Sequence, residues 1–205
     1  MIKQIIWDFD GVIVFSDEIR EFGFKEVLKE YHPSIIDGFL QFHRTNGGLS
    51  RYVKFRFMFE QLLEQTPNEN EILKLANQFS AIMQKKMINT DILNIEVVNF
   101  IRDKQKSVKH HIASGSDGNE LNYLCSELGI HSLFNSILGS PTPKSELVKQ
   151  IVASNGSNNE EFCLIGDALN DYEAAKLNGI AFYGYNNPNL SKFGILLETI
   201  KELPI

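Results

Sequence analysis

The sequence has few cysteines and no long apolar segment, and these absences narrow the possible classes of protein. Its 205 residues include only two cysteines, Cys125 and Cys163, which are too far apart to form a CxxC motif. We expect two buried, reduced thiols in a cytoplasmic protein. No apolar run approaches the roughly 20 residues that cross a bilayer, so no membrane partner is expected.

Basic charge and nucleotide-binding loops are also scarce. The formal net charge is −6, which argues against a nucleic-acid partner, because such proteins need a concentrated basic face. Neither a P-loop nor a GxGxxG motif occurs, which argues against an ATP-driven enzyme. What is present is 43% hydrophobic residues, including 15 phenylalanines. A chain of this length and composition can fold as one α/β domain, or as a smaller domain that carries an inserted one.

Short apolar runs that end at polar or glycine-containing turns indicate strands. They lie at residues 2–7, 108–114, 136–139, 161–165 and 180–183. Helical patterns separate the later runs, and we expect a polar loop at residues 154–159. Strands that alternate with helices predict a Rossmann-like, mostly parallel sheet between helices, with ligands beyond the carboxyl ends of the strands.

Residues 15–87 break this alternation. They contain no convincing strand, and apolar residues such as Tyr52, Phe55 and Phe59 recur at three- and four-residue spacing, which is typical of helices. The segment from Ile92 is expected to form the first crossover helix. We therefore predict an all-helical cap at residues 15–87, inserted into an α/β core of residues 1–14 and 88–205.

The sequence Asp8-Phe9-Asp10-Gly11 follows the first expected strand. Two carboxylates this close repel each other unless a cation lies between them, and hard oxygen ligands suit Mg²⁺. A calcium loop is excluded, since its sixth and twelfth positions would hold Ile13 and Ile19 instead of glycine and glutamate. The alternative is that two acidic residues end a strand for solubility only.

Polar residues also follow three later strands. They are Ser114 with Gly115, then Lys144, and then Asp167 with Asp171. Phosphoryl transfer through a phosphorylated carboxylate uses a carboxylate nucleophile, a hydroxyl and backbone amides for the phosphoryl oxygens, a cation, and acidic metal ligands. Taken singly, each feature has another interpretation: an ordinary turn, a surface lysine, or acidic residues that begin a helix.

In this order the motifs resemble those of the haloacid dehalogenase-like hydrolases, in particular the phosphoglycolate phosphatase and β-phosphoglucomutase branch, which carries a helical cap after the first motif. The resemblance implies that Asp8 forms an aspartyl-phosphate. Asp10 would protonate the leaving oxygen and then activate water, Ser114 and the Gly115 amide would bind the phosphoryl group, and Lys144 would steady it.

The same resemblance implies a Mg²⁺ cofactor. Its ligands would be Asp8, the carbonyl of Asp10 and Asp167, with Asp171 orienting its waters. The chain departs from the family pattern at Phe15, where an aspartate is usual, and at Arg20, which stands where hexose-phosphate mutases have a histidine.

Basic residues in the cap suggest how a substrate is selected. Arg51 ends a glycine-containing loop that begins at Gly48, and we expect Arg51 and Arg20 to bind an anionic substrate, because a guanidinium pairs well with carboxylate or phosphate. Lys54 and Arg56 are expected on a solvated helix face, and the same interpretation stays open for Arg51.

The sequence therefore predicts a Mg²⁺-dependent phosphatase for a small anionic phosphate monoester, with sugar phosphates favoured and phosphoglycolate possible. It would be a monomer or a small homo-oligomer. The alternatives are a phosphomutase of the β-phosphoglucomutase type, a receiver-like signalling module, and a catalytically silent protein that binds a phosphorylated ligand.

Overall fold

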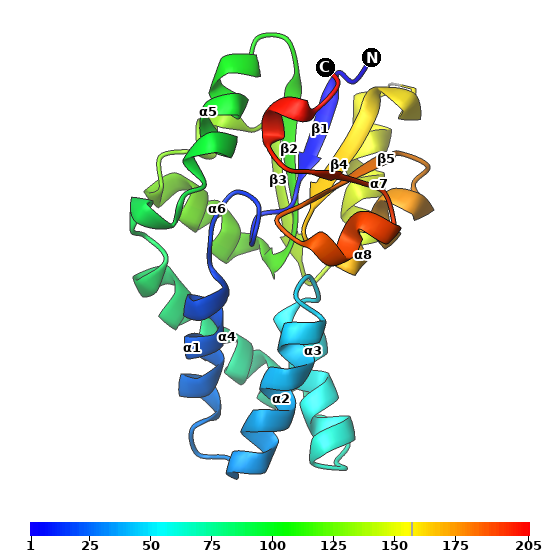
Figure 1. Cartoon of the computed structure of the whole chain (residues 1–205). Helices are drawn as coiled ribbons and strands as arrows, with labels where there is room; N and C mark the ends of the chain where they lie inside the picture. The colour runs from blue at the N-terminus through cyan, green and yellow to red at the C-terminus, as the bar shows by residue number, and fades with distance from the viewer. Residues whose placement is uncertain (157) are drawn as a thin grey trace.

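A computed structural model describes residues 1–156 and 158–205. Its centre is a six-stranded sheet in the order β3-β2-β1-β4-β5-β6, in which every pair of neighbours is parallel (Figure 1). The strands are β1 (Gln4–Trp7), β2 (Lys109–Asp117), β3 (Ser136–Ser140), β4 (Phe162–Gly166), β5 (Ala181–Tyr185) and β6 (Ile195–Leu197). The five strands expected from the sequence are present, and the Rossmann-like α/β fold is confirmed. The three-residue β6 was missed because so short a run gives no periodic signal.

Helices cover both faces of the sheet. They are α5 (Ile95–Lys104) and α6 (Gly118–Glu127) on one face, and α7 (Lys144–Asn155) and α8 (Leu169–Leu177) on the other (Figure 1). Alternate side chains of β1 enter different cores: Ile5 and Trp7 pack in the larger cluster, and Ile6 in the smaller one with residues of α7 and α8. All four residues of β1 are buried. A central parallel strand is covered on both faces, which explains the consecutive apolar residues 5–7.

Between β1 and α5 the chain forms only helices within the described residues. They are α1 (Asp17–Leu28), α2 (Pro33–Thr45), α3 (Arg51–Phe57), the π-helical turn η1 (Met58–Leu62) and α4 (Glu69–Lys86). We call residues 17–86 the cap and the remainder the core; the cap lies beyond the carboxyl ends of the strands (Figure 1). Stacked aromatic rings fill its interior, with Phe24 and Phe79 at 4.1 Å between centroids. The division into a cap domain at residues 15–87 and a core domain at residues 1–14 and 88–205 stays a prediction.

Two connections differ from the expected ones. The 3₁₀ turn η2 (Thr90–Ile92) precedes α5, which begins at Ile95 because the Asn94 side chain accepts a hydrogen bond from the Val97 amide at 3.4 Å. In the expected loop at residues 154–159, α7 continues to Asn155 and ends at Gly156, whose φ of +57° suits glycine. Ser157 lies outside the described residues. Four more 3₁₀ turns complete the chain: η3 (His131–Leu133), η4 (Asn159–Glu161), η5 (Pro188–Lys192) and η6 (Ile200–Glu202).

Cysteines and long apolar segments, both scarce in the sequence, give neither a cross-link nor a membrane-spanning helix within the described residues. Cys125 and Cys163 are buried and form no disulfide, as expected. Among the helices of the described residues, none combines the length and the apolar character needed to cross a membrane.

Candidate active site

The candidate site begins where β1 ends, between β2 and β4. Asp8 directly follows β1, and its amide donates a hydrogen bond to the Ile165 carbonyl of β4 at 2.9 Å. The Asp8 residue is only 3% exposed. In this strand order β2 and β3 extend the sheet on one side of β1, and β4, β5 and β6 extend it on the other. Ligands bind at such a switch point, in the crevice beyond the carboxyl ends of the strands.

Gly11 lets the chain turn away from this crevice. Its φ is +77°, and a Cβ at this position would overlap the Asp167 carboxylate. The Gly11 amide donates to the Val14 carbonyl at 2.8 Å and closes the turn. The glycine of the motif is therefore required both by the backbone conformation and by the close approach of Asp167.

Three carboxylates meet at this edge of the sheet. Asp8, Asp167 and Asp171 each offer one oxygen, and these oxygens lie within 4.8 Å of one another. The Lys144 ammonium is 2.9 Å from Asp8 Oδ1 and also contacts Asp171. The second Asp171 oxygen accepts a hydrogen bond from the Ala168 amide at 3.0 Å, which fixes this carboxylate at the start of α8.

The cluster carries more negative charge than one lysine balances. Burial, and then the charge of Asp171, raise the pKa of Asp8 to about 7, although Lys144 opposes the shift. Burial and the charges of Asp8 and Asp171 raise the pKa of Asp167 well above its ordinary value. A divalent cation would relieve this repulsion, and three carboxylates are a hard oxygen donor set that suits Mg²⁺.

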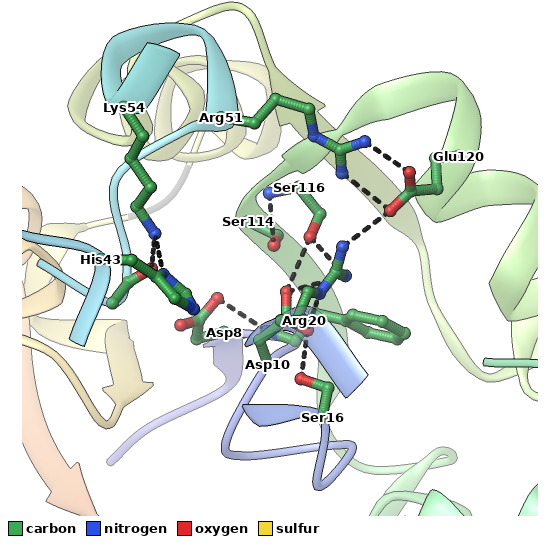
Figure 2. Close-up of polar contacts among 12 residues, drawn as sticks. Asp8, Asp10, Ser16, Arg20, His43, Arg51, Lys54, Ser114, Ser116 and Glu120 are labelled. Atoms are coloured by element: carbon green, nitrogen blue, oxygen red, sulfur yellow. Dashed lines mark hydrogen bonds and ion pairs between the residues drawn. The ribbon is translucent and has the colours of Figure 1, made fainter. Parts of the chain in front are cut away.

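The Asp10 carboxylate belongs to a separate network (Figure 2). It accepts hydrogen bonds from the Ser16 hydroxyl at 2.5 Å, the Ser116 hydroxyl at 2.6 Å, and Arg20 Nε and Nη2 at 2.9 and 3.1 Å. Burial by itself would raise the pKa of Asp10, but the Arg20 guanidinium and the two hydroxyls hold it below its ordinary value. In this structure Asp10 is a fully hydrogen-bonded carboxylate.

Ser114 and Gly115 lie in β2, opposite the acidic cluster. The buried Ser114 hydroxyl oxygen accepts a hydrogen bond from the Ser116 amide at 3.0 Å, so its own O–H group can donate to a ligand. A Cβ on Gly115 would overlap the Gly48 carbonyl oxygen of the cap. The expected glycine loop of the cap therefore lies directly on the residues expected to hold a phosphoryl group.

The two cap arginines that line the cavity, Arg20 and Arg51, are paired with carboxylates of the core. Arg51 donates to the two Glu120 oxygens at 2.6 and 2.8 Å, and Arg20 donates to Glu120 at 2.8 Å in addition to its bonds with Asp10. Arg51 also donates to the Ser80 hydroxyl at 2.6 Å. Figure 2 shows Glu120 between the two guanidinium groups. The charges of Arg20 and Arg51 are therefore already balanced by protein groups.

Lys54 is buried, which corrects the expectation that it lies on a solvated face. It is 3% exposed, and its ammonium is 2.9 Å from His43 Nδ1 and 2.9 Å from the Gly47 carbonyl oxygen. Lys54 follows Arg51 by three residues, so the two side chains share one face of α3. Arg56 lies on another face, has a side chain that is 42% exposed, and pairs with Glu69.

The core and the cap enclose a cavity of about 60 Å³. A buried water occupies roughly 10–15 Å³ on this scale, so the cavity holds only a few waters. Its charged lining residues are Asp8, Asp10 and Asp167 of the core and Asp17, Arg20, Arg51 and Lys54 of the cap; Ser114, Ser116 and His43 also line it.

A larger groove of about 1160 Å³ lies beside this cavity. Residues 47–49 line both spaces. The Asn170 side chain of α8 donates to the Gly48 carbonyl at 2.7 Å and ties this loop to the core. Residues 47–49 therefore lie between the cavity and the groove and contact the core.

All site residues expected from the sequence meet in this region: Asp8, Asp10, Ser114, Gly115, Lys144, Asp167, Asp171, Arg20 and Arg51. Ser16, Ser116 and Glu120 were missed, as were His43 and Lys54. Glu120 stands four residues before the buried Leu124, a spacing that indicates a buried carboxylate on α6. Its partners could not be inferred, because Arg51 and Arg20 lie 69 and 100 residues away in the sequence.

Comparisons with known proteins show the family and the fold of this chain. The family model described as haloacid dehalogenase-like hydrolase matches residues 5–185. A β-phosphoglucomutase structure from Clostridium difficile is 18% identical with a TM-score of 0.80, and the match covers 99% of this chain and 93% of that one. CbbY from Rhodobacter sphaeroides, in complex with xylulose-(1,5)bisphosphate, is 17% identical with a TM-score of 0.77, at 100% and 97% coverage. A haloacid dehalogenase-like hydrolase from Streptococcus pneumoniae is 19% identical with a TM-score of 0.71, at 98% and 96% coverage. Among curated proteins, none matches the sequence significantly.

Proposed function

This chain belongs to the haloacid dehalogenase-like hydrolases, and we propose that it is a phosphatase that hydrolyses a small anionic phosphate monoester. One observation carries the proposal: the buried Asp8 carboxylate lies 2.9 Å from Lys144, beside two further carboxylates, and faces a cavity that Ser114 and Gly115 also line. A nucleophile, a cation, phosphoryl-oxygen donors and metal ligands are thereby brought together.

In the first step, an unprotonated oxygen of Asp8 attacks phosphorus and the bond from phosphorus to the leaving oxygen breaks. Asp10 transfers its proton to that oxygen, which leaves as an alcohol. The Ser114 hydroxyl and the Gly115 amide hold the phosphoryl oxygens, and Lys144 neutralises charge on Asp8 and the phosphoryl group. The product on the enzyme is an aspartyl-phosphate at Asp8.

In the second step, water attacks phosphorus, the bond between phosphorus and the Asp8 oxygen breaks, and Asp10 accepts the proton of the water. The observed hydrogen bonds suit this second step, because Arg20 stabilises the carboxylate form of Asp10. The first step needs protonated Asp10, so we infer that the contacts of Arg20 with Asp10 loosen when substrate fills the cavity.

We propose Mg²⁺ as the cofactor, held by Asp8, Asp167 and the carbonyl of Asp10, with Asp171 orienting its waters. When bound, the ion neutralises phosphoryl charge and keeps the neighbouring carboxylates ionised. The acidic cluster supports this proposal, since it lacks enough protein cations to balance its charge.

Sugar phosphates are our favoured substrates, and phosphoglycolate is the second candidate. The fold neighbours include a β-phosphoglucomutase and a protein solved with a sugar bisphosphate, and three cationic cap residues line the cavity. We further propose that residues 15–87 act as a cap that opens to admit substrate. The enzyme would act in the cytoplasm as a monomer or a small homo-oligomer.

The test is release of inorganic phosphate from a panel of sugar phosphates, phosphoglycolate and p-nitrophenyl phosphate, with Mg²⁺ or with EDTA. We expect release to require Mg²⁺ and to disappear in Asp8→Asn, while the exposed control Asp103→Asn stays active. Turnover that survives Asp8→Asn would overturn the mechanism. Isomerisation of a sugar phosphate without release of phosphate, started by a bisphosphate, would establish the phosphomutase alternative.

A further inference from the structure

The three cations that line the cavity differ in their partners. Arg20 is paired with Asp10 and Glu120, and Arg51 is paired with Glu120. Lys54, by contrast, has hydrogen-bonding contacts with a histidine nitrogen and a backbone carbonyl, and within the described residues it forms no ion pair with a carboxylate at 4 Å or less. Lys54 is therefore the cavity cation whose charge remains available to a ligand.

The neighbours of Lys54 do not neutralise it. Burial, and then the charge of Lys54 itself, lower the pKa of His43 to about 3, so His43 is neutral and its Nδ1 accepts the hydrogen bond from Lys54. Asp10 and Asp17 act on Lys54 only from a distance, and Arg20 and Arg51 oppose them. Burial lowers the pKa of Lys54 to about 7. A buried ammonium without an anionic partner is unfavourable, and a bound anion would stabilise it.

The location of Lys54 relates it to the leaving group of a substrate. The residues proposed to hold the phosphoryl group, Ser114 and Gly115, belong to the core, whereas Lys54 belongs to α3 of the cap and lines the same cavity as Asp8 (Figure 2). A phosphate ester bound at Asp8 therefore directs its remaining atoms toward the cap. Because the cavity is small, a short leaving group lies near its cap lining, which includes Lys54.

We propose that Lys54 determines substrate specificity by pairing with a carboxylate on the leaving group of the ester. The inference rests on the proposed phosphatase activity and deepens it. It also moves the recognition of the anion from Arg51, as the sequence suggested, to a residue one turn further along α3. Arg51 is then a positioning residue that joins the cap to Glu120.

Matched pairs of substrates test this inference. Each pair consists of an acid and an otherwise identical compound, in which a neutral hydroxymethyl group replaces the carboxylate. Suitable pairs are phosphoglycolate with 2-hydroxyethyl phosphate, 3-phosphoglycerate with glycerol 3-phosphate, and 6-phosphogluconate with sorbitol 6-phosphate. In at least one pair we expect kcat/KM to favour the acid by about tenfold or more, as a charge-assisted contact provides. In Lys54→Met this preference should disappear through a higher KM for the acid, so that the ratio of the two kcat/KM values falls to about one, whatever loss both members of the pair share.

Lys54→Gln is the second variant, in case the thioether disturbs packing, and Arg56→Met is the matched control on the same helix. Thermal unfolding confirms that each variant is folded. Retention of the preference for the acid in both Lys54 variants, or its absence from the wild type in every pair, would overturn the inference and leave the phosphatase proposal intact. Absence of phosphate release from every ester would overturn both.

Discussion

Glu120 of the core accepts two hydrogen bonds from Arg51 of the cap, at 2.6 and 2.8 Å, and both side chains are almost completely buried. Glu120 also accepts a bond from Arg20 at 2.8 Å, and Arg20 in turn holds Asp10. One carboxylate therefore connects two cap helices to the core and to the residue proposed to transfer protons.

Replacing this carboxylate should destabilise the protein. In Glu120→Gln two buried guanidinium groups lose their shared counter-ion, and we expect a loss of about 3 kcal/mol in the free energy of unfolding. Urea unfolding measures the change. The control is Glu127→Gln on the same helix, where the side chain is exposed. Equal stability of the two variants would show that the ion pairs of Glu120 make no net contribution to the free energy of unfolding.

Gly115→Ala should reduce activity without unfolding the chain. The added methyl group would overlap the Gly48 carbonyl and prevent residues 47–49 from closing on the site. A displacement of about 1 Å at a reacting centre can cost about a hundredfold in rate, and we expect a loss of that order in kcat/KM. Gly47→Ala is the matched control, because its Cβ would meet no atom within 4 Å. Similar losses in both variants would contradict this explanation.

Addition of Mg²⁺ should raise the unfolding temperature. An ion at 100 times its Kd adds about 2.7 kcal/mol to the stability of the folded state. In Asp8→Asn one of the repelling carboxylates is absent, so the metal-free variant should be more stable than the metal-free wild type, and its response to Mg²⁺ should be smaller. Differential scanning fluorimetry, with Asp103→Asn as control, gives the unfolding temperature of each metal-free protein and its increase on addition of Mg²⁺. An undiminished Mg²⁺ shift in Asp8→Asn would exclude Asp8 as a ligand.

The stability of the fold should fall as the pH is lowered from about 6.5 to about 4, because burial lowers the pKa of three histidines, His43 of the cap and His110 and His111 of β2. Burial lowers the pKa of His110 and of His111 to about 4. The unfolded chain therefore binds protons in this range that the folded protein does not, which costs up to about 1.4 kcal/mol per pH unit for each histidine.

Saturating Mg²⁺ is needed in this measurement, because protonation of the metal-free acidic cluster has the opposite effect on stability. Urea unfolding at several pH values should give a shallower slope for His110→Gln than for the exposed control His131→Gln. Equal slopes of stability against pH for the two variants would show that the pKa of His110 does not differ between the folded and the unfolded protein.

Much of the fold could be predicted because its signals are local. The five longer strands are apolar runs that stop at polar turns, and helical spacing within residues 15–87 marks a segment without strands. The short β6 and the start of α5 at Ile95 could not be placed, since one is three residues long and the other depends on the Asn94 cap.

The sequence by itself determined the residues that gather at the carboxyl-terminal parts of β1, β2 and β4, because parallel strands bring their ends to one edge regardless of details elsewhere. The place of Asp8, Ser114 and Asp167 in the candidate site could be predicted from the order of strands and turns alone. Only the tertiary structure decided the partners of the cap cations. Lys54 and Arg56 are two residues apart on one short helix, yet one faces the cavity and the other faces solvent. That difference follows from how α3 packs on the core, and packing between segments distant in the sequence leaves no local pattern to read.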